Sequence, residues 1–504
     1  MCRAFWAKKT ADLKLTQRQV AKGMVILLVA MLIPLLWIAV YNYPADDDFG
    51  YVLPVAQAWL DTGSLWQVLK AVAYRSYQTC MGWQGYFVSN ALFCLNPMVL
   101  DIRLYFLGTW FMLALLCLSV AYLIKGVTGA LRASSSVFWI FYTACMVLAL
   151  QFMPSISNGI YWYNSAQYIT AVCILFINLG ILLRGMQPGQ SRGRRIRQSI
   201  CAGLCGFLLG GSFYAPALGG IVLLAFVAAA ALKKRAANRL QCCLSLGLAV
   251  VALCISMMSP GNALRQEGIG QTLPPLQTIV TAVLDGFDLI GKWITPQLLA
   301  ALLLICPVLW KPLKDSHFRF QHPLLVMIAL YGCLSASLAP GIYTGFGYDT
   351  ERYLNVVYIY FLLFAMGCVI YGEGWLIRHL EQSGQNNLLE AAKTLGQRFT
   401  AGYLAIVLAL TALGGFANTI MNTPSISAVK SIVSGEAATF LSEMQERQEY
   451  MRVTPSEETV VESLSCQPYV FKKDTVPFQG IYGKRLYMKR YFEAFAQSQQ
   501  NVEP

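Results

Sequence analysis

The chain of 504 residues has few charged side chains. Asp, Glu, Lys and Arg together make up only 12% of its residues, whereas 57% are hydrophobic. Soluble domains carry about 25% charged residues, so this composition excludes a water-soluble enzyme. The apolar residues instead form runs of about 20, the length that a helix needs to cross the hydrocarbon core of a bilayer. The sequence therefore predicts an all-α polytopic membrane protein.

Histidine is scarce, and the sequence contains no motif typical of a bound metal ion or nucleotide. The three His residues are His317, His322 and His379, and no Cys/His spacing is typical of a zinc site. A Gly-rich loop that would hold phosphate groups is also missing. We therefore expect no cofactor, with a divalent cation bound by carboxylates as the alternative left open.

The apolar runs, bounded by charged residues, predict about eleven membrane-spanning helices. Their expected ranges are 22–41, 104–124, 135–152, 167–183, 199–212, 216–232, 240–258, 294–310, 323–339, 353–371 and 401–419. The first run lacks a signal-peptide cleavage site and is expected to remain as the first span. The Gly-rich run 199–212 ends at a hinge, so half of a bent or re-entrant element is an alternative for it.

Basic residues are distributed unequally between the two sets of loops. Most of the 38 Lys and Arg residues fall in one set, which includes residues 1–21 and the basic run 192–197. Loops rich in Lys and Arg face the cytosol. We therefore expect a cytosolic N-terminus and, with an odd number of spans, an outside C-terminal region at 420–504. Between two spans, the run 192–197 is interpreted as a topology signal, so nucleic acid is not an expected partner.

The first outside loop, residues 42–103, is far longer than a connection between two helices requires. Its stretch 54–69 is amphipathic and is expected to form a helix in the membrane interface. The loop also contains three consecutive carboxylates, Asp46, Asp47 and Asp48. Capping of a helix N-terminus explains one of them, but three adjacent carboxylates repel one another. At least one is therefore expected to have a partner, such as a metal ion, a cationic side chain or a hydroxyl group to deprotonate.

Two other outside corners carry arginine. Arg265 follows Asn262 after the seventh expected span, and Arg352 follows Glu351 before the tenth. A guanidinium group binds phosphate oxygens through two parallel hydrogen bonds. The alternative is that both side chains only extend toward the polar membrane interface.

Aromatic and amide side chains are concentrated in the outside loop 154–164. It contains Tyr161 and Trp162 together with two Asn residues. Aromatic faces and amides are suited to binding a sugar ring, and an aromatic belt at the membrane interface is the alternative.

The order of these motifs resembles that of the bacterial DUF6056 family, which is grouped with the GT-C superfamily of membrane glycosyltransferases. The resemblance covers nearly the whole chain. It rests on the motifs at 44–51, 83–87, 159–162, 259–262 with Arg265, and 351–352. One departure lies at 212–216, where an acidic residue is expected in relatives and none is present here. The resemblance implies a GT-C-like membrane module at 22–419.

GT-C enzymes generally have a catalytic acidic residue in the first outside loop. The family's Ala-Asp-Asp-aromatic pattern falls on Asp47 and Asp48 when it is aligned at Phe49, and on Asp46 and Asp47 when it is aligned at Ala45. Asp47 is common to both alignments. By this resemblance Asp47 is the expected general base, and Asp46 or Asp48 would orient it or hold the acceptor.

The resemblance further implies transfer of a sugar from a polyprenyl-phosphate donor to a hydroxyl group of a cell-envelope glycan or lipid. The reaction would take place on the non-cytosolic face of the bacterial inner membrane, among membrane lipids. Arg265 and Arg352 would offset the charge that develops on the departing phosphate. The expected substrate-binding residues are Trp83, Gln84, Tyr161, Trp162, Asn262 and Glu351.

Two other classes of function stay open. A transporter or flippase of lipid-linked glycans would place ionisable groups at mid-membrane and show repeats between its halves, whereas the expected spans are almost free of charge. A non-catalytic membrane scaffold would recruit partners through the region 420–504. That region has mixed charge and many aromatic residues, so we expect a small appendage against the outer face, with a disordered tail as the alternative.

Overall fold

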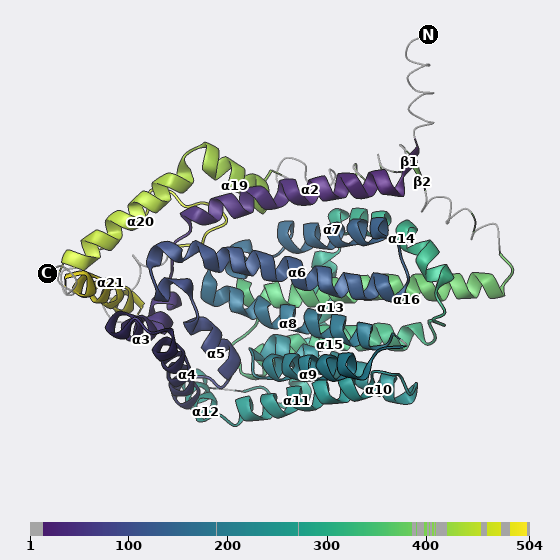
Figure 1. The fold of residues 1–504 in the computed structure, drawn as a ribbon, viewed down its shortest axis with the longest axis horizontal. Helices are drawn as coiled ribbons and strands as arrows, with labels where there is room; N and C mark the ends of the chain where they lie inside the picture. Colours follow the sequence, from purple (N-terminus) through teal and green to yellow (C-terminus); the bar gives the residue numbers. More distant parts are fainter. Residues whose placement is uncertain are drawn as a thin grey trace, which may run out of the picture.

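The computed structural model describes residues 14–187, 189–270, 272–385, 390, 398–400, 403, 406, 407, 409, 421–454, 461–474 and 484–500. Most of these residues are helical, and the long helices lie side by side in one bundle (Figure 1). The bundle contains α2 (Gln17–Ile38), α6 (Phe106–Ala130), α7 (Ser135–Gln151), α8 (Tyr163–Gly185), α9 (Arg192–Gly210), α10 (Tyr214–Lys233), α11 (Arg239–Met257), α13 (Pro275–Trp293), α14 (Pro296–Asp315), α15 (Pro323–Tyr343) and α16 (Glu351–Gln382).

Eight helices in the described part of the chain are long and apolar enough to cross a membrane. They coincide with eight of the expected spans, and α7 is a shorter apolar helix at a ninth. The expected segment 199–212 belongs to α9, which runs without a break from the basic run to Gly210. The all-α fold with apolar helices of membrane-crossing length is therefore confirmed. The last expected span, 401–419, lies almost entirely outside the described residues, so the count of about eleven stays a prediction.

The helix α8 lies at the centre of the bundle. In its most apolar window 83% of the residues are buried, against 28% for α2. A helix that is buried on all sides is packed against other helices around its whole circumference, whereas one that is mostly exposed lies at the edge. The first turn of α8 is therefore packed against several other helices, which fixes the positions of the residues that it contacts.

The long first loop, residues 42–103, folds into helices at one end of the bundle, on the left in Figure 1. These helices are α3 (Asp47–Thr62), α4 (Leu65–Gly82) and α5 (Phe87–Cys94), and α12 (Pro260–Ile269) lies beside α4. The short helical turns are η1 (Ala39–Tyr41), η2 (Pro97–Val99), η3 (Ile102–Leu104) and η4 (Ser157–Tyr161). The expected single helix 54–69 was wrong, because Gly63 ends α3 in a left-handed conformation (φ 61°) that glycine adopts without strain.

The described part of the C-terminal region contains three helices, α19 (Pro424–Val433), α20 (Glu436–Val453) and α21 (Lys484–Gln500). Of these, α21 packs on the first loop and α19 packs on α2. The ring of Phe49 in α3 lies 5.5 Å from that of Tyr491 and 5.6 Å from that of Phe492, both in α21. The Tyr491 hydroxyl donates a hydrogen bond to the Met98 carbonyl (2.6 Å). These contacts join α21 to the same end of the bundle as the first loop.

The opposite end of the bundle carries the two short strands. β1 (Lys14–Thr16) pairs antiparallel with β2 (Arg398–Thr400), and both lie on the right in Figure 1. The described N-terminal residues and the described C-terminal helices thus lie at different ends of the bundle.

Candidate functional site

Asp48 is completely buried and caps the N-terminus of α8. Its Oδ1 accepts a hydrogen bond from the backbone N–H of Asn164 (3.1 Å), and its Oδ2 accepts from the Tyr105 hydroxyl (2.7 Å) and the Ala45 N–H (3.0 Å). The Tyr105 hydroxyl in turn accepts from the N–H of Tyr163 (3.0 Å). The first N–H groups of a helix have no partner within the helix and carry partial positive charge. A carboxylate is therefore stabilised at this position.

The enclosure of Asp48 separates it from solvent. Burial raises the pKa of Asp48 to about 7, against its hydrogen bonds from Tyr105, Ala45 and Asn164, which lower it. With 0% of its surface exposed, Asp48 has no oxygen that a substrate hydroxyl can reach. Its contacts make it a positioning residue that fixes the start of α3 against α6 and α8.

Asp46 precedes α3 and has a cationic partner from the C-terminal region. Its Oδ2 lies 3.9 Å from Nζ of Lys472, and only 7% of the residue is exposed. Nζ of Lys472 also lies 4.8 Å from the centre of the Trp162 ring. The expectation that at least one of the three carboxylates has a partner is confirmed by Asp46 and Asp48.

Asp47 is the first residue of α3 and is the most exposed of the three carboxylates. It interacts electrostatically with Tyr51, one turn further along α3, and with Arg352 at the start of α16. Burial, and to a smaller extent Asp47, raises the pKa of Tyr51, so Tyr51 is a neutral phenol. Asp47 thus combines partial access to solvent with electrostatic interactions with a cation and a phenol.

Arg352 is half-buried between aromatic rings. Its guanidinium carbon lies 5.5 Å from the ring centre of Tyr168 and 5.8 Å from that of Trp162. It also interacts electrostatically with Tyr86 and Asp47. Cation–π contacts hold a guanidinium group in place without neutralising its charge. Arg352 can therefore attract an anion at this end of the bundle.

Gln84 links Arg265 to the first loop. Its Oε1 accepts hydrogen bonds from the Tyr86 hydroxyl and from Nη1 of Arg265 (2.7 Å). Its Nε2 donates to the Tyr51 hydroxyl (3.0 Å). Arg265 also lies 5.1 Å from the ring centre of Trp83. A guanidinium group has five N–H donors, so one bond to Gln84 positions Arg265 and still permits binding of an anion.

The arginines Arg265 and Arg352 both act on Tyr86. Nη1 of Arg265 lies 3.4 Å from the Tyr86 hydroxyl, and Arg352 interacts with the same phenol electrostatically. Burial raises the pKa of Tyr86, and Arg265 lowers it by less. The two cations that the sequence placed in separate outside corners are thus gathered around one neutral phenol.

Asn262 holds α12 against the first loop. Its Oδ1 accepts hydrogen bonds from the Gly85 N–H (2.9 Å) and the Tyr214 hydroxyl (3.0 Å), and its Nδ2 donates to the Ser256 carbonyl (2.7 Å). A Cβ on Gly85 would lie 1.9 Å from that carbonyl oxygen. Only glycine permits this approach. The contacts of Asn262 therefore position Arg265, one turn further along α12.

The other predicted substrate-binding residues differ in accessibility. Tyr161 is 1% exposed and its hydroxyl donates to the Leu35 carbonyl (2.8 Å), so its ring is covered by protein. Trp162 is also buried, between the two cations already described. Oε2 of Glu351 accepts from Nδ2 of Asn158 (2.6 Å). Trp83 is 53% exposed and offers a face for stacking.

Several residues of this region were not among those predicted from the sequence. They are Tyr51, Tyr86, Tyr105, Tyr168 and Lys472. The position of Tyr86 within the motif 83–87 was a usable signal. No sequence signal indicated Lys472, because it lies in a polar region far along the chain. We call the cluster of Asp46, Asp47, Arg265, Arg352, Lys472 and the phenols of Tyr51 and Tyr86 the candidate site.

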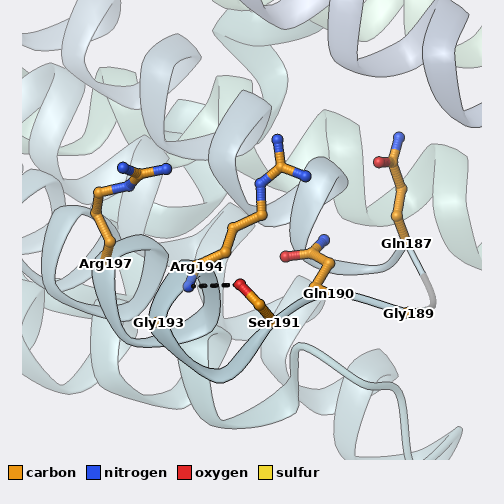
Figure 2. Close-up of a pocket in the computed structure, with 7 residues that line it drawn as sticks. All are labelled: Gln187, Gly189, Gln190, Ser191, Gly193, Arg194 and Arg197. Atoms are coloured by element: carbon orange, nitrogen blue, oxygen red, sulfur yellow. Dashed lines mark hydrogen bonds between the residues drawn. The ribbon is translucent and has the colours of Figure 1, made fainter.

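Of two cavities in the described structure, one is remote from the candidate site and the other adjoins it. A pocket of about 560 Å³ lies between the end of α8 and the start of α9, where Arg194 and Arg197 line it with Gln187 (Figure 2). It belongs to the opposite end of the bundle. A second cavity adjoins the candidate site and is lined by Asp46 and Lys472, among others. No group of three or more His, Cys, Asp or Glu in the described residues is arranged to hold a metal ion.

The described chain is a helical bundle with apolar helices long enough to cross a membrane, and it has charged and aromatic residues gathered at one end. Comparison of the chain with protein-family models, curated proteins and solved structures finds no match. The resemblance to the DUF6056 family therefore stays a prediction.

Proposed function

We propose that the chain is a membrane glycosyltransferase that moves a sugar from a polyprenyl-phosphate donor to a hydroxyl group of a cell-envelope glycan or lipid. The observation that carries the proposal is the different environment of each carboxylate. Asp48 is enclosed by hydrogen bonds, Asp46 is paired with Lys472, and Asp47 has partial access to solvent and interacts electrostatically with Arg352. One accessible carboxylate beside cations is what base-assisted transfer from a phosphate requires.

In the proposed reaction Asp47 takes the proton of the acceptor hydroxyl. The hydroxyl oxygen forms a bond to the anomeric carbon of the sugar while the bond from that carbon to the phosphate oxygen breaks. The electron pair of the broken bond stays with the polyprenyl phosphate. Arg352 and Arg265 stabilise the negative charge that develops there, a contribution that is often the largest in such reactions.

The electrostatic interaction of Arg352 with Asp47 favours this division of roles. Arg352 interacts with both Asp47 and Tyr86, and Arg265 approaches Tyr86 from α12. A phosphate bound by the two guanidinium groups would therefore lie near the carboxylate that serves the acceptor. The buried rings of Tyr168 and Trp162 limit the contact of Arg352 with water, which strengthens its electrostatic interactions.

We further propose that the site faces away from the cytosol in a bacterial inner membrane, with the N-terminus cytosolic. The distribution of Lys and Arg between loops supports this orientation. The packing of α21 on α3 supports a common side for the first loop and the C-terminal region. A lipid phosphate is itself a leaving group, so the reaction needs no nucleotide on that side.

A transporter of lipid-linked glycans is the second candidate, and one observation bears on it. Glu373 of α16 has both carboxylate oxygens buried without a partner among the described residues. Ionisable groups within membrane helices often mark transport pathways. Glu373 lies 22 residues after the start of α16, or about 33 Å at 1.5 Å per residue. It is therefore near the far end of the span rather than at its middle, which favours the transferase.

The experiment that tests the proposal uses the purified full chain in liposomes with a polyprenyl phosphate that carries a labelled hexose. A transferase releases the polyprenyl phosphate and moves the label to an acceptor, and Arg352→Gln is expected to slow this release about 100-fold or more. A transporter moves the intact lipid across the bilayer without breaking the bond. Translocation without cleavage would overturn the transferase proposal.

A further inference from the structure

The pocket between the end of α8 and the start of α9 has an entirely polar lining. Its volume is about 560 Å³, and it is lined by two glycines and by Gln187, Gln190, Ser191, Arg194 and Arg197. Small-molecule sites have volumes of about 300–1,000 Å³, so a polar group of that size can enter. Among the described residues, no carboxylate and no aromatic ring lines the pocket. Its lining therefore suits an anion rather than a cation or a nucleobase.

The two arginines of the pocket have no side-chain partner in the described part of the chain. Figure 2 shows one hydrogen bond among the residues of the pocket, from the Arg194 backbone N–H to the Ser191 hydroxyl (3.4 Å), and none from either guanidinium group. Arg194 and Arg197 are both exposed. Arg184 of α8 differs, because its guanidinium group packs on the Tyr122 ring (3.6 Å to the ring centre) and donates to the carbonyl of that residue (3.2 Å). The donors of Arg194 and Arg197 are therefore available to an external acceptor.

The position of these cations in α9 is electrostatically unfavourable without an anion. Arg192, Arg194, Arg195 and Arg197 occupy the first two turns of α9, and its first turn contains no acidic residue. The N-terminus of a helix already carries partial positive charge, and like charges three residues apart in a helix repel each other. A bound anion would offset both effects. A phosphate group suits this position, because guanidinium groups donate charge-assisted hydrogen bonds to its oxygens.

An exposed apolar stripe continues from the pocket along α9. Ile200 and Leu204 follow Arg197 at three and seven residues, and residues at these spacings share one face of a helix. Their side chains are 63% and 55% exposed. In a membrane, an exposed apolar helix face contacts acyl chains. A molecule that has an anionic head and an apolar chain therefore matches this face of α9.

The pocket is separate from the candidate site. The two lie at opposite ends of α8, whose 23 residues have a length of about 35 Å. The hydrocarbon core of a bilayer is about 30 Å thick. A pocket at this end of α8 would therefore lie at the membrane surface opposite to the candidate site, where the basic run 192–197 is expected to face the cytosol.

We propose that this pocket binds the phosphate group of an anionic phospholipid, with an acyl chain of that lipid along Ile200 and Leu204. The inference does not depend on the proposed transferase function. Arg194 and Arg197 donate hydrogen bonds to the phosphate oxygens, and basic pockets next to membrane helices attract anionic headgroups. The bound lipid offsets the repulsion among the arginines and thereby stabilises the start of α9.

The unfolding midpoint of the full chain in nanodiscs tests the inference without any measurement of turnover. Phosphatidylcholine nanodiscs are compared with nanodiscs that contain an increasing fraction of phosphatidylglycerol. The midpoint of the unmodified chain is expected to rise with this fraction, because a lipid that binds the folded chain stabilises it. The double variant Arg194→Gln, Arg197→Gln is expected to lose most of that rise. In pure phosphatidylcholine its midpoint is expected to stay the same or to increase, since repulsion between like charges is removed. No rise in the unmodified chain would overturn the inference.

A charge-matched variant distinguishes the pocket from diffuse attraction. Arg192→Gln with Arg195→Gln removes the same charge from the same helix, but neither residue lines the pocket. Affinity is measured by titration of phosphatidylglycerol into the full chain in neutral detergent. Loss of the hydrogen bonds from Arg194 and Arg197 to a charged group is expected to weaken binding about 100-fold or more. The control variant loses only general attraction and is expected to weaken binding less than about 30-fold. Equal losses in the two double variants would overturn the assignment to the pocket.

Soluble anions distinguish a lipid from free phosphate. Inorganic phosphate and glycerol 1-phosphate share the phosphate chemistry of phosphatidylglycerol but have no acyl chain. In neutral detergent each is expected to raise the unfolding midpoint much less than phosphatidylglycerol at the same concentration, because contact with Ile200 and Leu204 is missing. An equal rise with either soluble anion would overturn the assignment to a lipid.

Discussion

The hydroxyl group of Tyr105 is predicted to be the main link between the start of α3 and the start of α8. Tyr105 is 1% exposed. Its hydroxyl donates to Oδ2 of Asp48 (2.7 Å) and accepts from the N–H of Tyr163 (3.0 Å). Tyr105→Phe removes both hydrogen bonds and adds no bulk. The free energy of unfolding is therefore expected to fall.

The size of the effect follows from the groups left unpaired. At about pH 8.5 the carboxyl group of Asp48 is ionised, because its pKa is about 7. A hydrogen bond to a charged group contributes about 1.5–3 kcal/mol, and an unpaired buried N–H costs about 1–3 kcal/mol. Tyr105→Phe is thus expected to cost about 2.5–6 kcal/mol at that pH. At about pH 5.5 Asp48 is protonated and the lost bond is neutral, so the cost is expected to be about 1 kcal/mol smaller.

Equilibrium unfolding of the full chain in mixed micelles, at the two pH values, checks this prediction. Tyr161→Phe is the matched control, because Tyr161 is equally buried and its hydroxyl makes one neutral bond to the Leu35 carbonyl (2.8 Å). It is expected to cost about 1 kcal/mol at both pH values. A cost for Tyr105→Phe equal to that of the control, or independent of pH, would refute the role assigned to the Asp48 carboxylate.

Three further predictions concern residues around the candidate site. Because the pKa of Asp48 is raised to about 7 from about 3.9 in an exposed carboxyl group, the folded protein binds the proton more tightly, and stability falls as pH rises between these values. Asp48→Asn is expected to remove this part of the slope in unfolding measurements, and an unchanged slope would contradict the assignment. Lys472→Met is expected to lower kcat/KM about tenfold, the effect of about 1.4 kcal/mol, whereas the exposed neighbour Lys473→Met should change it less than about twofold; equal effects would exclude a specific role for Lys472. Gly85→Ala places a Cβ 1.9 Å from a carbonyl oxygen of α11 and is expected to lower the unfolding midpoint, while Gly82→Ala, with no atom within 4 Å, should not.

The helical bundle was predictable because apolar runs of about 20 residues bounded by charged residues favour helices long enough to cross a bilayer. Ten of the eleven expected spans coincide with helices of the described part, for example α8 with 167–183. Helix boundaries were less accurate, since they depend on caps and local turns. The division of the expected helix 54–69 depends on one glycine, Gly63, whose φ is left-handed, and an amphipathic pattern does not report the conformation of a single glycine.

The sequence predicted the charged residues of the candidate site other than Lys472. It did not predict which of the three carboxylates is buried, which is ion-paired and which is accessible. The predicted topology assigned Asp47, Arg265 and Arg352 to loops on the same side, and in the structure they lie at the same end of the bundle. Periodicity gave no means of distinguishing Asp46 from Asp48, because their difference arises from tertiary partners. The partner of Asp46 is Lys472, which is distant in sequence. The partner of Asp48 is Tyr105, which lies at the start of an apolar helix.

Burial also separated residues that the sequence grouped together. Tyr161 and Trp162 were predicted as one aromatic surface, yet both are buried in the described structure. An aromatic residue in an outside loop is equally consistent with stacking on a sugar, an interfacial belt or a core position. The choice depends on which helices cover the loop, here the described C-terminal region through Phe471 and Lys472.

The rate of sugar transfer by Asp47→Asn tests the central claim most directly. The purified variant is compared with the unmodified chain in release of polyprenyl phosphate from a labelled donor, with the unfolding midpoint measured on the same samples. Asn keeps the size of the side chain but cannot take a proton, so the rate is expected to fall about 10²- to 10⁴-fold with an unchanged midpoint. Undiminished release by Asp47→Asn would contradict the account.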